Sequence, residues 1–204
     1  MVHTPLYPRF LEAQQAAGRT RADFRLLSGP LAVHVAPTRD EAERGLHHIG
    51  YWTDDLDAAM AQAERVPGVG PFQVLAHADP GDFRFRGEPA VLDHSAAFAA
   101  WGPVLLELNV VHDAAPAALR DALGIRPGPV SHVAWTTGDL SAERQHLATA
   151  GCPLLTTSVA GAVADWFGGG SLSGHPIEVH QPPSGVLDFW ASVRERSGGQ
   201  SSSA

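Results

Sequence analysis

An internal repeat limits the folds open to this 204-residue chain more than any other feature of its sequence. Residues 48–56 and 132–140 share one pattern: His, a β-branched apolar residue, a small residue, an aromatic residue, any residue, Thr, any residue, Asp and Leu. Self-similarity of this kind arises where one small structural unit is used more than once. The sequence therefore predicts two copies of a single module.

The segments that follow each copy also correspond. A helical stretch comes first, at 57–66 and at 141–150, and the best N-caps for these helices are Asp55 and Asp139, or the neighbouring Asp57 and Ser141. Strand-like segments come next, at 72–76, 83–100 and 104–111 in the first copy and at 154–159, 162–167 and 176–181 in the second. Each module is therefore predicted to be βαβββ, with a linking helix at 114–123 and a closing helix at 186–194.

The chain is predicted to divide into four segments. An N-terminal extension occupies 1–43, the first module with its linking helix occupies 44–124, and the second module with its closing helix occupies 125–196. The Gly/Ser-rich tail at 197–204 is expected to be disordered.

The last strand of each module carries a carboxylate among apolar residues. Glu107 lies in Leu-Leu-Glu-Leu, and Glu178 lies in Pro-Ile-Glu-Val. An unpaired charge in an apolar strand is costly to bury. Metal binding explains both carboxylates.

Strand alternation places these carboxylates on the same side as the repeated histidines. If Ile49 and Tyr51 face the helix of the first module, then His48 faces the opposite side, and the same reasoning applies to His132. The leucines on either side of Glu107, like Ile177 and Val179 beside Glu178, turn each carboxylate away from the helix. Four ligand-type side chains are therefore expected on the concave, non-helical side of the two sheets: His48, Glu107, His132 and Glu178.

Two imidazoles and two carboxylates suit one borderline divalent ion, namely Mn, Fe, Co, Ni or Zn. An octahedral ion with four protein ligands keeps two adjacent positions open for two oxygens of a substrate. The ion then acts as a Lewis acid and lowers the cost of negative charge on an enolate.

Composition excludes several other kinds of chemistry. All 14 basic residues are Arg, and a chain without Lys can form neither a lysine Schiff base nor a P-loop. A single cysteine, Cys152, excludes an intramolecular disulfide and Cys-rich metal sites. The net charge of −8 argues against a nucleic-acid partner, and the sequence has neither a run of about 18 apolar residues nor a visible secretory signal. We therefore expect a cytoplasmic protein with no membrane span.

Three segments resemble the vicinal oxygen chelate superfamily, which includes glyoxalase I, methylmalonyl-CoA epimerase, extradiol dioxygenases and bleomycin-resistance proteins. They are Leu-His-His-Ile-Gly-Tyr at 46–51, Val-Ser-His-Val-Ala-Trp at 130–135 and Ile-Glu-Val at 177–179. Gly-Pro-Phe at 70–72 is similar to the glyoxalase-like branch near the epimerase. The resemblance covers residues 44–182 and implies an α+β fold in which two tandem βαβββ modules form a curved half-barrel sheet around a metal site. It places the metal ligands at His48, Glu107, His132 and Glu178, and by analogy with glyoxalases it makes Glu178 a candidate acid/base.

The function expected from this ligand set is that of a metal-dependent isomerase, epimerase or lyase, which acts on a small carbonyl substrate through a metal-stabilised enolate-type intermediate. One alternative is an iron-dependent extradiol-type dioxygenase, although Glu107 fills a position that this chemistry prefers to leave open. Another is a non-catalytic protein that binds a drug-like small molecule. Paired sheets of this size often share edges, so a homodimer is expected.

Some neighbours of the predicted ligands have two interpretations. His47 is expected to point away from His48 as a solvated or strand-end residue. His180 either supports the ligands or carries protons, or it is an exposed strand-end residue, and the second interpretation is favoured. Four aromatic residues either wall an apolar pocket near the ion or pack in the core: Phe98, Trp101, Trp166 and Phe167.

Overall fold

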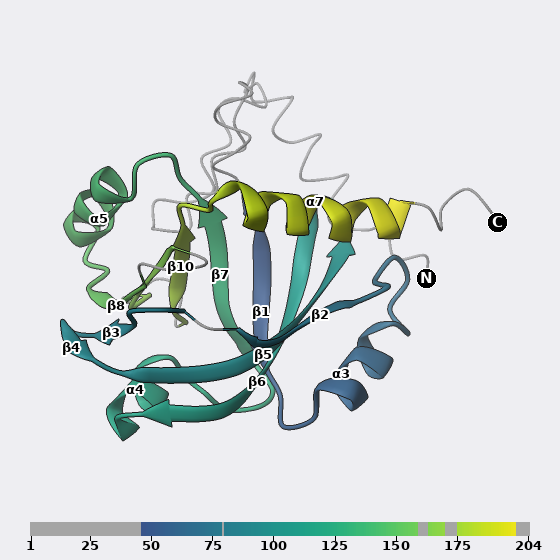
Figure 1. The fold of residues 1–204 in the computed structure, drawn as a ribbon, viewed down its shortest axis with the longest axis horizontal. Helices are drawn as coiled ribbons and strands as arrows, with labels where there is room; N and C mark the ends of the chain where they lie inside the picture. The colour runs from purple at the N-terminus through teal and green to yellow at the C-terminus, as the bar shows by residue number, and fades with distance from the viewer. Residues whose placement is uncertain (1–45, 79, 159–162, 170–174, 199–204) are drawn as a thin grey trace, which may run out of the picture.

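Ten strands form one mixed sheet that curls into a half-barrel (Figure 1). This computed structural model describes residues 46–78, 80–158, 163–169 and 175–198. The predicted N-terminal extension at 1–43 and residues 199–204 of the predicted tail lie outside the described residues. The predicted α+β half-barrel is confirmed.

The elements of the first half of the chain are β1 (His48–Trp52), α3 (Leu56–Ala63), β2 (Gln73–Ala78), β3 (Arg84–Phe85), β4 (Glu88–Pro89), β5 (Val91–Trp101), β6 (Val104–Ala115) and α4 (Ala117–Ala122). Those of the second half are β7 (Val130–Thr136), α5 (Leu140–Thr149), β8 (Leu154–Thr157), β9 (Ala164–Phe167), β10 (Ile177–His180) and α7 (Ser184–Gly198). The sheet order is β2-β5-β6-β1-β7-β10-β9-β8-β3-β4.

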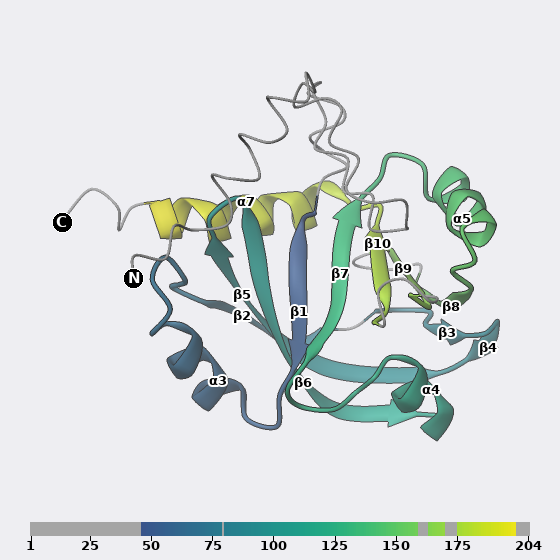
Figure 2. The ribbon, with the colours of Figure 1, turned by 180° about the vertical axis from the view of Figure 1, so that it is seen from behind.

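The two repeated strands lie side by side at the centre of this sheet. β1 and β7 pair antiparallel, and each also pairs in parallel with the last strand of its own half, β6 or β10. Figure 2 shows β1 and β7 between these two partners. The arrangement brings the two His-bearing strands and the two Glu-bearing strands together.

The two repeat helices begin where the sequence predicts. The side chains of Asp55 and Asp139 accept hydrogen bonds from the backbone N–H groups of Ala58 and Ala142, each at 2.9 Å. An N-cap of this kind satisfies a helix donor that otherwise has no partner. Asp55 and Asp139, rather than their neighbours, are therefore the caps.

Each repeat helix covers the convex face of its own half. Under α3 lie Leu106 and Leu108 of β6, and under α5 lie Ile177 and Val179 of β10. These are the residues that flank Glu107 and Glu178, so both carboxylates point to the opposite, concave face.

The long strand expected at 83–100 is interrupted. Arg86 and Gly87 have positive φ values of 53° and 86°, and they form a turn that separates β3 from β4. β3 then pairs antiparallel with β8 of the second half. The first half therefore contributes the hairpin that ends the sheet beyond β8 (Figure 1).

The closing helix α7 lies on the concave face, where no helix was expected. Trp190 and Val193 of α7 pack against Phe98 and Leu105 of strands β5 and β6. Leu105 has the same orientation in β6 as Glu107, so α7 covers part of the face that carries the predicted ligands. The prediction of a concave side without helices is wrong, because the apolar residues of α7 need a surface on which to be buried. No helix within the described residues combines the length and apolar character needed to cross a membrane.

Candidate metal centre

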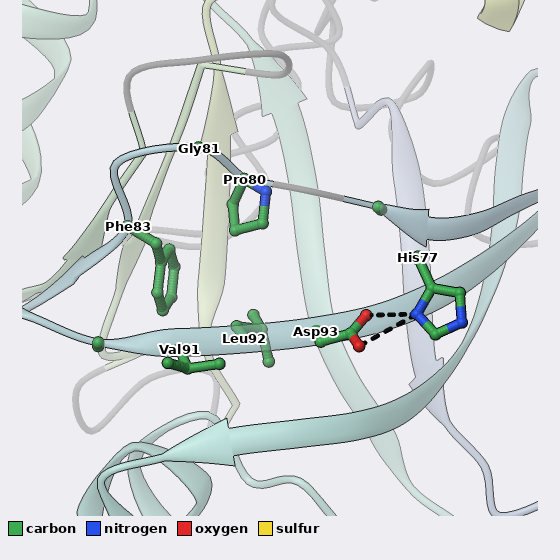
Figure 3. Close-up of a pocket in the computed structure, with 9 residues that line it drawn as sticks. His77, Pro80, Gly81, Phe83, Val91, Leu92 and Asp93 are labelled. Atoms are coloured by element: carbon green, nitrogen blue, oxygen red, sulfur yellow. Dashed lines mark hydrogen bonds and ion pairs between the residues drawn. The ribbon is translucent and has the colours of Figure 1, made fainter.

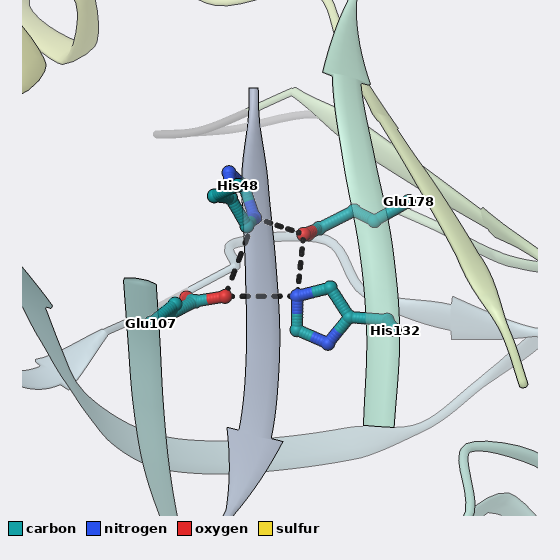
Figure 4. A group of neighbouring side chains, drawn as sticks. All are labelled: His48, Glu107, His132 and Glu178. Atoms are coloured by element: carbon teal, nitrogen blue, oxygen red, sulfur yellow. Dashed lines mark hydrogen bonds and ion pairs between the residues drawn. The ribbon is translucent and has the colours of Figure 1, made fainter. Parts of the chain in front are cut away.

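The four predicted ligands converge from four adjacent strands. His48 comes from β1, His132 from β7, Glu107 from β6 and Glu178 from β10 (Figure 4). One ligand atom from each lies within 4.8 Å of the others, and all four residues are buried. The sheet register explains the convergence, since it places His132 opposite Gly50 of β1 and places His48 opposite Ala134 of β7.

The spacing of the four atoms matches the coordination sphere of a small divalent ion. His48 Nε2 lies 3.3 Å from Glu107 Oε2 and 3.2 Å from Glu178 Oε2. His132 Nε2 lies 2.8 and 3.5 Å from the same two oxygens. Ligands about 2.1 Å from an ion are about 3.0 Å apart at octahedral angles and about 3.4 Å apart at tetrahedral angles. The residues present fit a metal ion.

Without an ion, the two carboxylates and the protonated imidazole of His48 stabilise one another as charges. Burial lowers the pKa of His48, but Glu107 and Glu178 outweigh this effect and raise that pKa to about 9. Burial raises the pKa of Glu107, but His48 and His132 outweigh it and hold that pKa well below its ordinary value. The cluster without an ion therefore holds a proton on His48 at neutral pH, and a bound divalent ion would supply positive charge to the two carboxylates in place of this proton.

Each ligand histidine is oriented by the residue that precedes it. His47 Nδ1 and Ser131 Oγ each lie 2.9 Å from the Nδ1 atom of the following histidine. Burial lowers the pKa of His47 to about 2, so His47 is neutral and can accept a hydrogen bond from His48 Nδ1–H. A hydrogen bond at Nδ1 leaves Nε2 of a ligand histidine free to bind an ion.

The expectation that His47 points away from His48 is wrong, although His47 does lie at the end of a strand, directly before β1. Its ring also packs on Trp190 of α7, with 4.1 Å between ring centroids, and His47 is partly buried. A polar residue directly before the histidine in both copies of the repeat was the signal that sequence reasoning missed.

His180 is also buried rather than exposed. It is 6% exposed, and its Nε2 lies 3.0 Å from Glu178 Oε2. The ring packs edge-on against Trp190, with 5.2 Å between centroids. The favoured interpretation of an exposed strand-end residue is therefore wrong, because α7 covers this end of β10.

Two of the four aromatic residues considered for a pocket wall lie beside the cluster. The Phe98 ring is 5.8 Å from the His48 ring, and the Trp166 ring is 4.5 Å from the His132 ring. Phe167 instead packs in the core beneath α5, and Trp101 is 41% exposed. The cluster thus has aromatic walls on two sides.

Comparison with protein families gives one match. The model of the glyoxalase/bleomycin resistance protein/dioxygenase superfamily matches residues 47–167. A comparison with curated proteins gave no match.

Several solved structures have a similar fold. Methylmalonyl-CoA epimerase from Mycobacterium tuberculosis is 19% identical, with a TM-score of 0.48, over 71% of this chain and 91% of that chain. A variant of Streptomyces coelicolor methylmalonyl-CoA epimerase in complex with 2-nitronate-propionyl-CoA is 17% identical, with a TM-score of 0.48, over 69% of this chain and 96% of that chain. A hypothetical protein from Bacillus halodurans C-125 is 14% identical, with a TM-score of 0.48, over 69% of this chain and 95% of that chain.

Proposed function

Because the chain belongs to the glyoxalase/bleomycin resistance protein/dioxygenase superfamily, we propose that it is a divalent-metal-dependent isomerase, epimerase or lyase that acts on a small carbonyl compound. The observation that carries this proposal is the convergence of four buried ligand atoms within 4.8 Å of one another. Four strands of one sheet hold these side chains, and this rigidity suits a catalytic site better than ligands on loops would.

His48, Glu107, His132 and Glu178 would hold the ion. When bound, it supplies a Lewis acid that stabilises negative charge on a substrate carbonyl oxygen. The hydrogen bonds that His48 and His132 make to His47 and Ser131 fix both imidazoles, so that the site is organised before the substrate arrives.

Proton transfer is assigned to Glu178 together with His180. Burial raises the pKa of Glu178, but His180, His48 and His132 outweigh it and hold that pKa well below its ordinary value. A carboxylate with so low a pKa holds a proton only briefly. His180 Nε2 lies 3.0 Å from Glu178 Oε2 and favours the carboxylate form of Glu178, which is the form that can accept a proton from a substrate.

Buried polar atoms without a protein partner favour a substrate with several polar groups. Among the residues that the structure describes, Asn109 Oδ1 and His94 Nδ1 are buried and have no hydrogen-bond partner. Asn109 follows Glu107 by two residues in β6, so both have the same orientation. Such atoms are costly to leave unpaired, and a bound substrate can satisfy them.

Metal analysis tests the site directly. We expect the purified or metal-reconstituted protein to bind one divalent ion that His132→Ala no longer binds. His146→Ala, an exposed histidine on α5, is the matched control and should leave this ion in place. Absence of any such ion in the wild-type protein before and after reconstitution would contradict the proposal.

Deuterium exchange tests the chemistry. The metal-loaded protein is incubated in D₂O with a panel of keto compounds, acyl thioesters and ring carbonyl compounds, and NMR follows the hydrogen on the carbon next to the carbonyl group. We expect exchange with at least one class, and we expect Glu178→Gln to abolish it while the exposed Glu88→Gln leaves it unchanged. Exchange by Glu178→Gln at the wild-type rate would remove this residue from the mechanism.

A further inference from the structure

Two β-bulges flank strand β5 at the same level and bring two histidines together. On one side, β2 has two residues, at 76 and 77, opposite one residue of β5, because its register shifts between Leu75 and Ala78. On the other side, the pairing of β5 with β6 shifts by one residue between Asp93 and His94. As a result, His112 of β6 has no residue directly opposite it in β5. Bulges redirect side chains and are common beside functional sites.

The redirected histidines meet a carboxylate from the strand between them. His77 Nδ1 lies 2.9 Å from Asp93 Oδ1 and 3.0 Å from Oδ2 (Figure 3). The rings of His77 and His112 stack with 4.3 Å between centroids and an angle of 29°. One ligand atom from each of the three residues lies within 4.8 Å of the others.

A buried serine holds both histidines in place. Ser95 is 6% exposed, and its Oγ lies 2.7 Å from His112 Nε2. The same Oγ accepts a hydrogen bond of 3.1 Å from the backbone N–H of His77. Because His112 Nε2 is hydrogen-bonded to Ser95, the other ring nitrogen, Nδ1, is the one that can bind a metal ion.

A cavity of about 380 Å³ opens beside these residues. His77 and Asp93 line it together with apolar side chains that include Phe83 and Leu92 (Figure 3). Two ligand-type side chains at the edge of this cavity leave room for water or a small molecule next to a bound ion.

We propose that His77, Asp93 and His112 bind a second divalent transition-metal ion, of which Zn²⁺ is the representative. Two imidazoles and a carboxylate are ligands that suit Zn²⁺, and three protein ligands leave a further position open toward the cavity. This cluster shares no residue with the four-ligand centre. The side chains of His77 and Asp93 are 66% and 39% exposed, so they can make the small movements that close a coordination sphere.

The ion would also link the edge strand β2 to the two strands that follow it in the sheet, β5 and β6. Its ligands come from β2, β5 and β6, and β2 is the terminal strand on that side of the sheet. Binding to the folded state alone raises apparent stability. Added Zn²⁺ should therefore increase the melting temperature through this site.

Titration of metal-free protein with Zn²⁺, followed by calorimetry and metal analysis, tests the proposal. We expect His77→Ala and His112→Ala each to bind one ion fewer per chain than the wild type, whether or not the four-ligand centre is also filled. His146→Ala, an exposed histidine elsewhere, should bind as many ions as the wild type. Ser95→Ala should bind the ion about tenfold more weakly, as is typical when a group that orients a ligand is removed.

Because His77 and His112 are exposed, their replacement should leave the fold intact, and circular dichroism checks this. Equal Zn²⁺ uptake by the wild type and by folded His77→Ala and His112→Ala variants would overturn the proposal. An increase in melting temperature with Zn²⁺ that is as large in both variants as in the wild type would show that an ion at this second site does not stabilise β2, because the four-ligand centre is unchanged in the variants.

Discussion

Replacement of Gly50 by Ala tests how closely the four-ligand centre depends on one missing side chain. Gly50 lies in β1 opposite His132, and the imidazole ring of His132 lies directly over it. A Cβ atom at this position would be 1.8 Å from His132 Cε1 and 2.3 Å from Nε2. The absence of a side chain at Gly50 therefore provides the space that the His132 ring of the other module occupies.

The size of the disturbance follows from these distances. Non-bonded carbon atoms approach to about 3.5 Å, so the His132 ring would have to move by more than about 1.5 Å. Metal–ligand distances tolerate changes of only about 0.2 Å. Movement on this scale removes His132 from the coordination sphere. Overpacking of a buried position should also cost about 1 to 3 kcal/mol of stability.

Metal content and thermal unfolding measure the two effects. We expect Gly50→Ala to fold with a lower melting temperature and to lose the ion bound by the four-ligand centre. Gly138→Ala is the matched control, because a Cβ atom there would have no neighbour within 4 Å. A Gly50→Ala protein with full metal content and an unchanged melting temperature would refute the placement of the His132 ring directly over Gly50.

Three further perturbations probe other parts of the structure. The metal-free protein should lose stability as pH rises from about 6.5 to about 9, because folding raises the pKa of His48 and the stabilising proton is lost across this range. Thermal unfolding at a series of pH values measures this loss. His48→Gln should make the melting temperature less dependent on pH in the same range. Arg144→Ala should lower the free energy of unfolding in urea by about 3 kcal/mol, because it leaves the fully buried Asp165 carboxylate without its ion-pair partner. The control is Arg120→Ala, on the exposed side of α4, which should change this free energy little. The Cys152 thiol should react with a disulfide reagent only after unfolding, since it is buried and burial raises its pKa; rapid labelling of the native protein would contradict this placement.

The repeat made much of the centre predictable. Alternation along a strand fixes the face on which each side chain lies, so the apolar neighbours of Glu107 and Glu178 were sufficient to orient both carboxylates. Asp55 and Asp139 similarly located the start of each helix, because capping is a local interaction. The convergence of the four side chains required one further condition, the pairing of β1 with β7, which brings two distant segments of the chain together.

The features that sequence reasoning missed depend on contacts between distant parts of the chain. β3 and β4 have two residues each, too few for a periodic pattern, and β3 pairs with β8 of the second half while β4 pairs only with β3. The apolar face of α7 predicts a packed helix but not the surface on which it packs, and this surface determines the burial of His47 and His180.

The pairing of β3 with β8 has a mechanical consequence for access to the centre. The two halves are joined along β1 and β7, and the hairpin of the first half holds the outer strands of the second, so the sheet is fastened at two separate seams. A hinge at the linking helix α4 would have to break one of these seams before the halves could separate. Helix α7 is attached to the concave face by side-chain packing and is connected to β10 at one end, so it can lift while the sheet stays whole. Opening the concave face past α7 therefore breaks side-chain packing alone, whereas separating the two halves breaks backbone hydrogen bonds between strands.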